Sequence, residues 1–318
     1  MIKIFLVNSP LLKLSNFSIV HKETNKTIVR DISFEVHENE VVGIIGESGS
    51  GKSLTMLSIL GIIPDSLKAV GEMYFEGQKI EDPRDLRGKK ISMIFQDPLT
   101  ALNPVLKIID QINLISKSNK MEYSSTLDEF KKLLISMKIQ NPERVLKSFP
   151  HQLSGGMLQR VAISLVLLLK PKLIIADEPT TSLDVTVQKE IIGIIKKIKT
   201  TEGKSIIFIT HDIMLAKELV DRIIVMYAGE IMEIGSTNNI IESPLHPYTK
   251  LLIDSVPRVD SKPERLTFLQ GRVPHFSEIA NGCVFFNRCP IAEIGRCDIF
   301  KPNTQRKYDN HLVKCFFA

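Results

Sequence analysis

The stretch that decides the fold reads Gly46-Glu47-Ser48-Gly49-Ser50-Gly51-Lys52-Ser53. It fits the pattern G-x-x-x-x-G-K-S in full and follows a solid apolar run over residues 41–45. Apolar residues on both faces of so short a run indicate a buried parallel strand, and the spacing of apolar residues over 54–60 predicts a helix. A strand, a glycine-rich loop and a helix in this order predict a phosphate-binding loop.

The residue types of this phosphate loop (residues 46–53) suit a nucleotide with several phosphates. Glycines allow positive φ and bring backbone N–H groups close to phosphate oxygens, and the helix N-terminus adds to this anion cradle. Lys52 supplies a mobile positive charge for the β- and γ-phosphates, and the hydroxyl of Ser53 is a candidate Mg²⁺ ligand. We therefore expect all eight residues to take part in binding the nucleotide.

A second candidate site follows the apolar stretch over residues 172–176, where Asp177 and Glu178 stand side by side. Open α/β sheets place their ligands at the carboxyl ends of strands. Neighbouring residues of a strand point opposite ways, so the two acids are assigned different tasks. Asp177 suits the Mg²⁺ shell, and Glu178 suits the orientation or deprotonation of an attacking water. His211, after the predicted strand at 205–210, would alone be a structural histidine, but at a strand end it is a candidate to hold that water or sense the γ-phosphate.

The rest of the chain predicts an α/β fold with additions. Alternating strands precede residue 36, and helical patterns at 105–115, 127–139 and 159–169 predict a helical insertion, with a further helix at 187–198. Residues 1–7 are predicted to form a first strand. From about residue 251, prolines interrupt the patterns of helices and strands, which predicts a small, loop-rich appendage. They are Pro257, Pro263, Pro274, Pro290 and Pro302.

Composition limits the class of protein. The 318 residues are 43% hydrophobic, and 41 Lys and Arg against 36 Asp and Glu give a net charge of +5, too weak to argue for nucleic acid. No apolar run approaches the length of about 20 residues that a membrane-spanning helix needs. We expect a cytosolic chain whose link to a membrane runs through a partner.

All four cysteines (Cys283, Cys289, Cys297 and Cys315) fall in the last 36 residues, with spacings C-x₅-C, C-x₇-C and C-x₁₇-C. A cytosolic protein rarely makes structural disulfides, so the group points to a metal or to chemistry. The close C-x₂-C pairs of zinc ribbons and bacterial ferredoxins are missing. A cluster, a zinc ion and no metal all remain open. His311 is a candidate substitute ligand but is expected at the surface.

One further motif points to a family. Leu153-Ser154-Gly155-Gly156-Met157 resembles LSGGQ, the signature of the nucleotide-binding subunits of ATP-binding cassette (ABC) transporters, with Met157 replacing the commonest Gln. Phe95-Gln96-Asp97-Pro98 resembles the family's Q-loop and Ser182-Leu183-Asp184 its D-loop. The resemblance covers about residues 10–245. It implies a P-loop, RecA-like ATPase core with an antiparallel β subdomain and a helical subdomain at about 97–168.

The resemblance also implies roles. Ser154, Gly155 and Gly156 face the γ-phosphate of ATP held by the other subunit, Gln96 reaches Mg²⁺ and the attacking water, and Glu178 drives hydrolysis. The family usually stacks adenine on an aromatic residue in an early loop. The stretch Ile19-Val20-His21 offers none at that place, and Phe17 is expected in the core.

A finer resemblance is to the oligopeptide and dipeptide importer branch, and it rests on three segments in addition to residues 95–104. These are Met226-Tyr227-Ala228-Gly229-Glu230, His246-Pro247-Tyr248-Thr249 and the cysteine-bearing end. The branch implies an ABC domain over 1–250 and a C-terminal extension over 251–318. It also implies a peripheral place at the cytoplasmic face of the membrane, a second ABC ATPase subunit, two permease subunits and an extracellular solute-binding protein.

Several alternatives stay open. Some members of this branch carry a four-iron, four-sulfur cluster on four cysteines, which this chain matches. Nickel and metallophore importers share many of the same sequence segments. Soluble ABC ATPases of DNA repair or translation carry tandem cassettes or long coiled coils, of which this sequence shows none, and a non-hydrolytic cassette is disfavoured because every catalytic position is filled.

Overall fold

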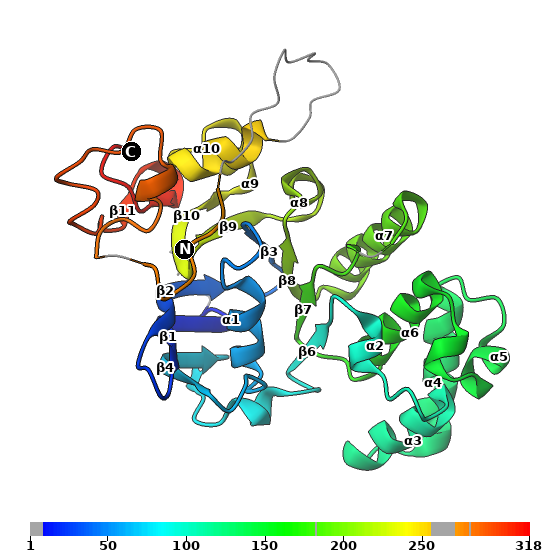
Figure 1. Ribbon diagram of the computed structural model, residues 1–318. Helices are drawn as coiled ribbons and strands as arrows, with labels where there is room; N and C mark the ends of the chain where they lie inside the picture. The colour runs from blue at the N-terminus through cyan, green and yellow to red at the C-terminus, as the bar shows by residue number, and fades with distance from the viewer. Residues whose placement is uncertain (1–8, 182, 256–270, 280) are drawn as a thin grey trace, which may run out of the picture. The chain divides into compact units, whose positions relative to one another are not determined.

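Figure 1 shows the computed structural model of the chain, which describes residues 9–181, 183–255, 271–279 and 281–318. The described chain divides into two compact units. The first combines the residues up to 85 with residues 207–318, and the second consists of residues 86–206. The strand predicted at 1–7, Ser182 of the predicted D-loop, Pro257 and Pro263 lie outside the described residues.

The first unit contains a four-stranded antiparallel sheet with the order β2-β1-β4-β5. Its strands are β1 (Leu12–His21), β2 (Thr27–Val36), β4 (Leu67–Phe75) and β5 (Gln78–Lys79). Phe17 is 4% exposed, as expected of a core residue. The antiparallel β subdomain implied by the sequence is therefore present.

A second sheet in this unit has the order β11-β12-β10-β9-β3-β8. Its strands are β3 (Val41–Ile45), β8 (Ser205–Thr210), which enters the unit at Ile207, β9 (Arg222–Tyr227), β10 (Glu230–Ser236), β11 (Gln305–Arg306) and β12 (Leu312–Val313). All five residues of β3 are buried, and the last four pair in parallel with β9, as its apolar run predicts. The two short C-terminal strands extend the sheet through β10, where Glu233 pairs with Val313.

The helices of the first unit follow these strands along the chain. They are α1 (Lys52–Ile59), α8 (Ile213–Leu219), α9 (Thr237–Glu242), α10 (Pro247–Asp254) and the 3₁₀ turns η1 (Pro83–Leu86), η3 (Phe286–Arg288) and η4 (Tyr308–Asn310). Side chains that accept backbone N–H bonds cap three of them, at Asp212, Ser236 and His246.

The second unit pairs two parallel strands, β6 (Ile91–Ile94) and β7 (Leu173–Asp177). Its helices are α2 (Pro98–Ala101), α3 (Ile108–Ser118), α4 (Tyr123–Ser136), α5 (Pro142–Lys147), η2 (Pro150–Gln152), α6 (Gly155–Leu168) and α7 (Val185–Glu202). The helices α3 to α6 share one apolar core in which Ile112, Phe130 and Leu134 are fully buried. The helical insertion predicted from apolar spacing is therefore present. Among the described residues, no helix is both long enough and apolar enough to cross a membrane.

Candidate nucleotide-binding and catalytic residues

The phosphate loop joins β3 to α1 in the first unit, as the sequence predicts. Its first glycine, Gly46, has φ 155°, and a Cβ there would lie 2.1 Å from the carbonyl oxygen of Met226. Gly51 caps α1 in the left-handed region with φ 96°. Only glycine meets both demands without strain, which is the physical reason for the spacing of the motif. The loop thereby leads into the N-terminus of α1, which favours anions.

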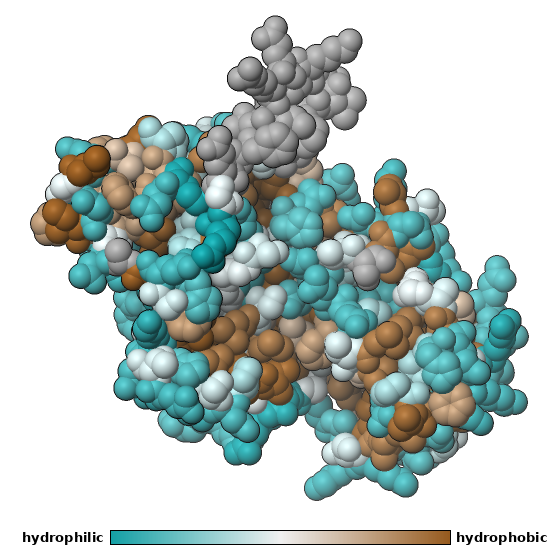
Figure 2. Space-filling model, viewed as in Figure 1, coloured by the Kyte–Doolittle hydropathy of each residue, from teal (hydrophilic) through white to brown (hydrophobic). Residues whose placement is uncertain are grey.

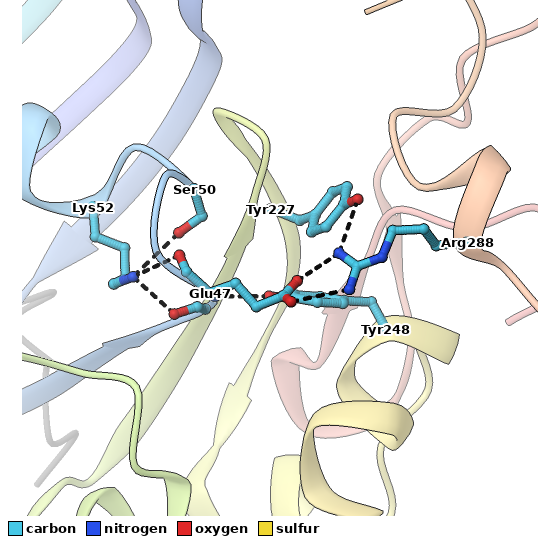
Figure 3. Close-up of polar contacts among 7 residues, drawn as sticks. Glu47, Ser50, Lys52, Tyr227, Tyr248 and Arg288 are labelled. Atoms are coloured by element: carbon cyan, nitrogen blue, oxygen red, sulfur yellow. Dashed lines mark hydrogen bonds and ion pairs between the residues drawn. The ribbon is translucent and has the colours of Figure 1, made fainter. Parts of the chain in front are cut away.

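The side chain of Lys52 lies inside the phosphate loop. The residue is 5% exposed, and its ammonium donates to the carbonyl oxygens of Gly46 (2.8 Å) and Glu47 (2.9 Å) and to Ser50 Oγ (3.3 Å). Figure 3 shows these three bonds from one nitrogen. A positive charge held among the loop's own oxygens is in place to meet phosphate oxygens that approach the same loop.

Residues far along the chain bind both the side chain and the backbone of Glu47. Its carboxylate forms a two-pronged ion pair with Arg288 of η3, at 2.7 Å from Nη1 and 3.0 Å from Nη2. Its backbone N–H donates to the hydroxyl of Tyr248 at 2.9 Å (Figure 3). Such fork-to-fork pairs fix geometry as well as adding energy. The carboxylate of Glu47 thus faces the C-terminal part of the chain.

Aromatic rings pack beside the contacts of Glu47 with Arg288 and Tyr248. Tyr227 and Tyr248 pack on Phe285 at centroid distances of 5.1 and 5.2 Å, and the hydroxyl of Tyr227 accepts a bond from Arg288 at 3.2 Å. Burial raises the pKa of both tyrosines, so their hydroxyls stay protonated at neutral pH. The pair with Glu47 raises the pKa of Arg288, so its charge is permanent. The link between the C-terminal region and the phosphate loop is therefore ionic on one side and apolar on the other.

In the second unit, Asp177 and Glu178 occupy the end of β7. Asp177 is the last strand residue and is 6% exposed, while Glu178 follows with φ 43°. Glu178 Oε2 accepts bonds from Thr181 Oγ1 at 2.9 Å and from Gln96 Nε2 at 3.3 Å. The structure thus brings together two of the predicted catalytic residues, Gln96 and Glu178.

The signature residues open α6 of the second unit. Ser154 is its N-cap, and its hydroxyl accepts a bond from the N–H of Met157 at 3.4 Å. Ser154 and Gly155 are exposed, whereas a Cβ on Gly156 would lie 2.9 Å from a methyl of Val187 in α7. Glycine at position 156 therefore lets α7 come close, and the exposed start of α6 is open to an anion.

Three further predicted residues stand at the start of other helices. His211 is exposed and lies between β8 and Asp212, the N-cap of α8. Asp184 of the predicted D-loop caps α7, where its carboxylate accepts bonds from the N–H groups of Thr186 (3.1 Å) and Val187 (3.0 Å). Ser53, the candidate Mg²⁺ ligand, is half-buried in the first turn of α1.

The four cysteines gather in one region without forming disulfides. The N–H of Cys283 donates to the carbonyl of Cys297 at 2.7 Å, and burial raises the pKa of Cys283 to about 11, with the other three thiols adding to the rise. A metal ligand must be the thiolate. Among the described residues, no group of three or more His, Cys, Asp or Glu side chains is arranged to hold a metal ion. The thiols fit the predicted cluster in kind but not in this arrangement.

The prediction for His311 is wrong. The residue was expected at the surface, but it is fully buried, and its Nε2 lies 2.7 Å from Oε1 of Glu233, which is buried as well. Glu233 also accepts from the N–H groups of Leu245 (2.7 Å) and His246 (3.1 Å). The pair joins η4 and β12 to β10, so His311 holds the C-terminal strands in place.

Known proteins similar to this chain were found at the level of family, sequence and fold. A family model described as ABC transporter matches residues 29–181, and one described as oligopeptide/dipeptide transporter, C-terminal region matches residues 232–297. The dipeptide transport ATP-binding protein DppD of Bacillus subtilis is 41% identical over 296 residues, which cover 91% of this chain and 88% of that protein. This chain belongs to the ABC transporter ATP-binding subunits, in the oligopeptide/dipeptide branch.

Other relatives of this ABC ATPase agree. The oligopeptide transport ATP-binding protein OppD of Escherichia coli is 39% identical over 84% of this chain and 81% of its own length. Among solved structures, the dimeric ABC transporter cassette MJ0796 superposes with a TM-score of 0.60 at 31% identity, covering 71% of this chain and 98% of that one. CbiO1 of Clostridium perfringens has a TM-score of 0.63 at 26% identity, over 74% of this chain and 91% of its own. The predicted family, branch and ATPase fold are confirmed.

Sequence reasoning missed the residues that act across long separations. Arg288 and Tyr248 hold Glu47 from 241 and 201 positions away, and no local pattern marks either contact. The one available signal was indirect: both residues stand in segments that resemble the peptide-importer branch, His246-Pro247-Tyr248-Thr249 and Arg288-Cys289-Pro290.

Proposed function

We propose that this ABC ATPase powers the uptake of oligopeptides or dipeptides through membrane permease subunits. The observation that carries the ATP-dependent part is the phosphate loop, with its left-handed glycines and the ammonium of Lys52 held inside it. The peptide part rests on relatives whose names are those of dipeptide and oligopeptide transport proteins. Those names do not favour the nickel alternative.

In this proposal, the loop over residues 46–53 binds the phosphates of ATP through its backbone N–H groups and Lys52, apart from the N–H of Glu47, which donates to Tyr248. The hydroxyl of Ser53, the carboxylate of Asp177 and the amide oxygen of Gln96 are assigned to Mg²⁺, because oxygen donors of this kind are those that the ion prefers. When bound, Mg²⁺ would neutralise charge on the phosphate oxygens.

Glu178 is assigned to the attacking water. The bonds from Gln96 and Thr181 to one of its oxygens support this role, because they fix where the carboxylate points. A positioned carboxylate orients the water and takes up its proton as the water oxygen bonds to the γ-phosphorus, while the bond from that phosphorus to the β,γ-bridging oxygen breaks and ADP leaves. His211 is assigned to hold the same water or the γ-phosphate.

The signature residues are assigned to a second ATPase subunit's nucleotide. The exposed N-terminus of α6, with Ser154, Gly155 and Gly156, supports this role, since its N–H groups are open to an anion. Two cassettes would then close on ATP, each supplying α6 to the other, and part after hydrolysis. The partner is proposed to be a different ABC subunit rather than a second copy.

The permease subunits are proposed to contact the segment after Gln96. Exposed apolar side chains follow it at Leu99 (45%), Val105 (75%) and Leu114 (51%). Figure 2 shows apolar surface on this unit over α2 and the helices beside it. Such exposure is typical of interaction surfaces. Together with a solute-binding protein outside the cell, these subunits would place the chain at the cytoplasmic face of the membrane.

The transported solute is tested in the assembled transporter. We expect its ATPase activity in vesicles to rise when the solute-binding protein carries peptides and to stay at the basal level with nickel chelates. Stimulation by nickel chelates alone would replace the peptide proposal with the metal alternative. Purification without a permease, and with nucleic acid instead, would favour a soluble ABC ATPase.

The four-iron, four-sulfur cluster remains a prediction from the sequence. It is tested by purifying the protein without oxygen and measuring its absorption spectrum, iron and acid-labile sulfide. Stoichiometric iron and sulfide that are lost in a Cys297→Ser variant would support it. Folded, colourless and iron-free protein would contradict it.

A further inference from the structure

A cavity of about 240 Å³ lies beside the phosphate loop in the first unit. Ser48 and Gly49 of the loop, Ile28 of β2 and Ala228 of the β9–β10 turn form one part of its lining. The C-terminal segment, residues 272–276 together with Ile279, forms the remainder. The C-terminal region therefore borders the same loop twice, through this cavity and through the pair between Arg288 and Glu47.

The segment that lines the cavity has a defined shape. Glu278 accepts a bond from the N–H of His275 at 2.9 Å and pairs with Arg272 at 2.6 Å, while its own N–H donates to the carbonyl of His275 at 2.8 Å. Arg30 of β2 donates to the carbonyl oxygens of Ala228 (2.7 Å) and Phe276 (3.5 Å). These bonds connect the segment to the strand and to the turn on the other side of the cavity.

The lining has the chemistry of a site for a flat, partly apolar group. Ile28 and Phe276 give it apolar walls, and Arg272 and His275 give it polar groups, with the rings of His275 and Phe276 4.1 Å apart between centroids. Pockets that enclose whole small ligands measure about 300–1,000 Å³, so this cavity suits part of a ligand. It also adjoins open space, since a Cβ on Gly49 would meet no atom within 4 Å.

The loop itself determines which part of the ligand reaches the cavity. A nucleotide whose phosphates lie on residues 46–53 must carry its sugar and base away from the loop, and the cavity begins at Ser48 and Gly49. Two aromatic rings of β1 and β2 are not open to a base, because Phe17 and Phe34 are buried in the core.

We propose that this cavity is the nucleoside subsite of the ATP site and that Phe276, from the C-terminal region, is its stacking surface. The assignment rests on the proposed function, because it needs ATP phosphates on the loop. It adds a binding task to the region that also carries the cysteines, and it supplies an aromatic wall in a chain whose early strands offer none at the expected place.

The test compares ligands with and without a nucleoside. Binding of MgATP and of inorganic tripolyphosphate with Mg²⁺ is measured by calorimetry on the full chain and on Phe276→Ala. We expect the variant to bind MgATP about ten-fold more weakly, the scale of losing one base–aromatic contact, and to bind tripolyphosphate as the natural chain does. Phe276→Tyr should keep the affinity for MgATP. Phe300→Ala is the matched control, because Phe300 is 59% exposed in the same region.

The outcomes separate the two proposals. Unchanged MgATP affinity in Phe276→Ala would overturn the subsite. Equal losses for both ligands would also overturn it, because Phe276 would then only support the loop. Failure of the natural chain to bind either ligand would contradict the proposed function itself.

Discussion

The phosphate loop and the cysteine-bearing region (residues 281–318) are built in opposite ways. Inside the loop, Lys52 bonds to carbonyl oxygens only six and five positions away, at Gly46 and Glu47. The cysteine-bearing region has little regular structure of its own, and its main contacts reach far: His311 pairs with Glu233 across 78 positions and Arg288 with Glu47 across 241. Contacts within a short motif can be predicted from the sequence, whereas contacts between residues far apart in the chain cannot.

The two regions nevertheless meet at one residue. Glu47 is held through its carbonyl by Lys52, through its N–H by Tyr248 and through its carboxylate by Arg288. We therefore expect the motifs to carry out ATP hydrolysis and the C-terminal region to support the phosphate loop. The predictions below separate these two contributions.

The largest effect is expected where the motifs carry the chemistry. Glu178→Gln removes the carboxylate that would orient and deprotonate the water, so turnover should fall by about 10²–10⁴-fold while MgATP binding is retained. ATPase and nucleotide-binding assays on the purified protein check this. Glu143→Gln, an exposed glutamate in the same unit, is the control. Full activity in Glu178→Gln would refute its role.

The buried pair that anchors the C-terminal strands should matter for stability instead. His311→Leu leaves the carboxylate of Glu233 buried without its imidazole partner, which should lower the free energy of unfolding by about 3 kcal/mol. Urea denaturation followed by circular dichroism measures this, with the exposed His37→Leu as control. Equal midpoints for the two variants would show that the C-terminal strands do not depend on the pair.

Acid should loosen the same part of the first unit. Burial lowers the pKa of His246 to about 3, so the unfolded chain binds a proton below pH 6.5 that the folded chain does not. Stability should therefore fall as the pH drops, by about 2 kcal/mol between pH 6.5 and pH 5.

Unfolding curves at several pH values test this. His246→Asn keeps a side chain suited to cap α10 and should lose much of this pH dependence. If the variant shows the same slope as the natural chain, the acid sensitivity lies in other groups.

The smallest effect is expected at the junction of the two regions. Arg288→Met removes the ion pair that positions Glu47, so the KM for ATP should rise about ten-fold while kcat changes little. Arg288→Lys should lie between, because an ammonium cannot form the two-pronged pair. Arg296→Met, which loses contacts with Phe316 and Phe317 instead, is the control. A change in kcat alone would mean that Arg288 acts on the chemical step.

Much of the fold was predictable because its signals are local. The apolar run at 41–45 and the glycines after it predict β3 and the start of α1, and the predicted helix at 159–169 lies largely within α6. The helix begins before residue 159, at Gly155 after the N-cap Ser154, as expected for the serine and glycines of the signature. Three features depend on residues that only the folded chain brings together. They are the burial of His311, the contacts of Arg288 and Tyr248 with Glu47, and the cavity beside Gly49. No spacing rule could have predicted them.

Hydrolysis by a composite site is the central claim, and ATPase activity as a function of protein concentration tests it most directly. The chain alone should hydrolyse ATP slowly while it is monomeric, with activity per chain rising as addition of the second ABC ATPase subunit supplies that subunit's signature helix. A monomer whose activity per chain is high and constant over the whole concentration range would contradict the claim.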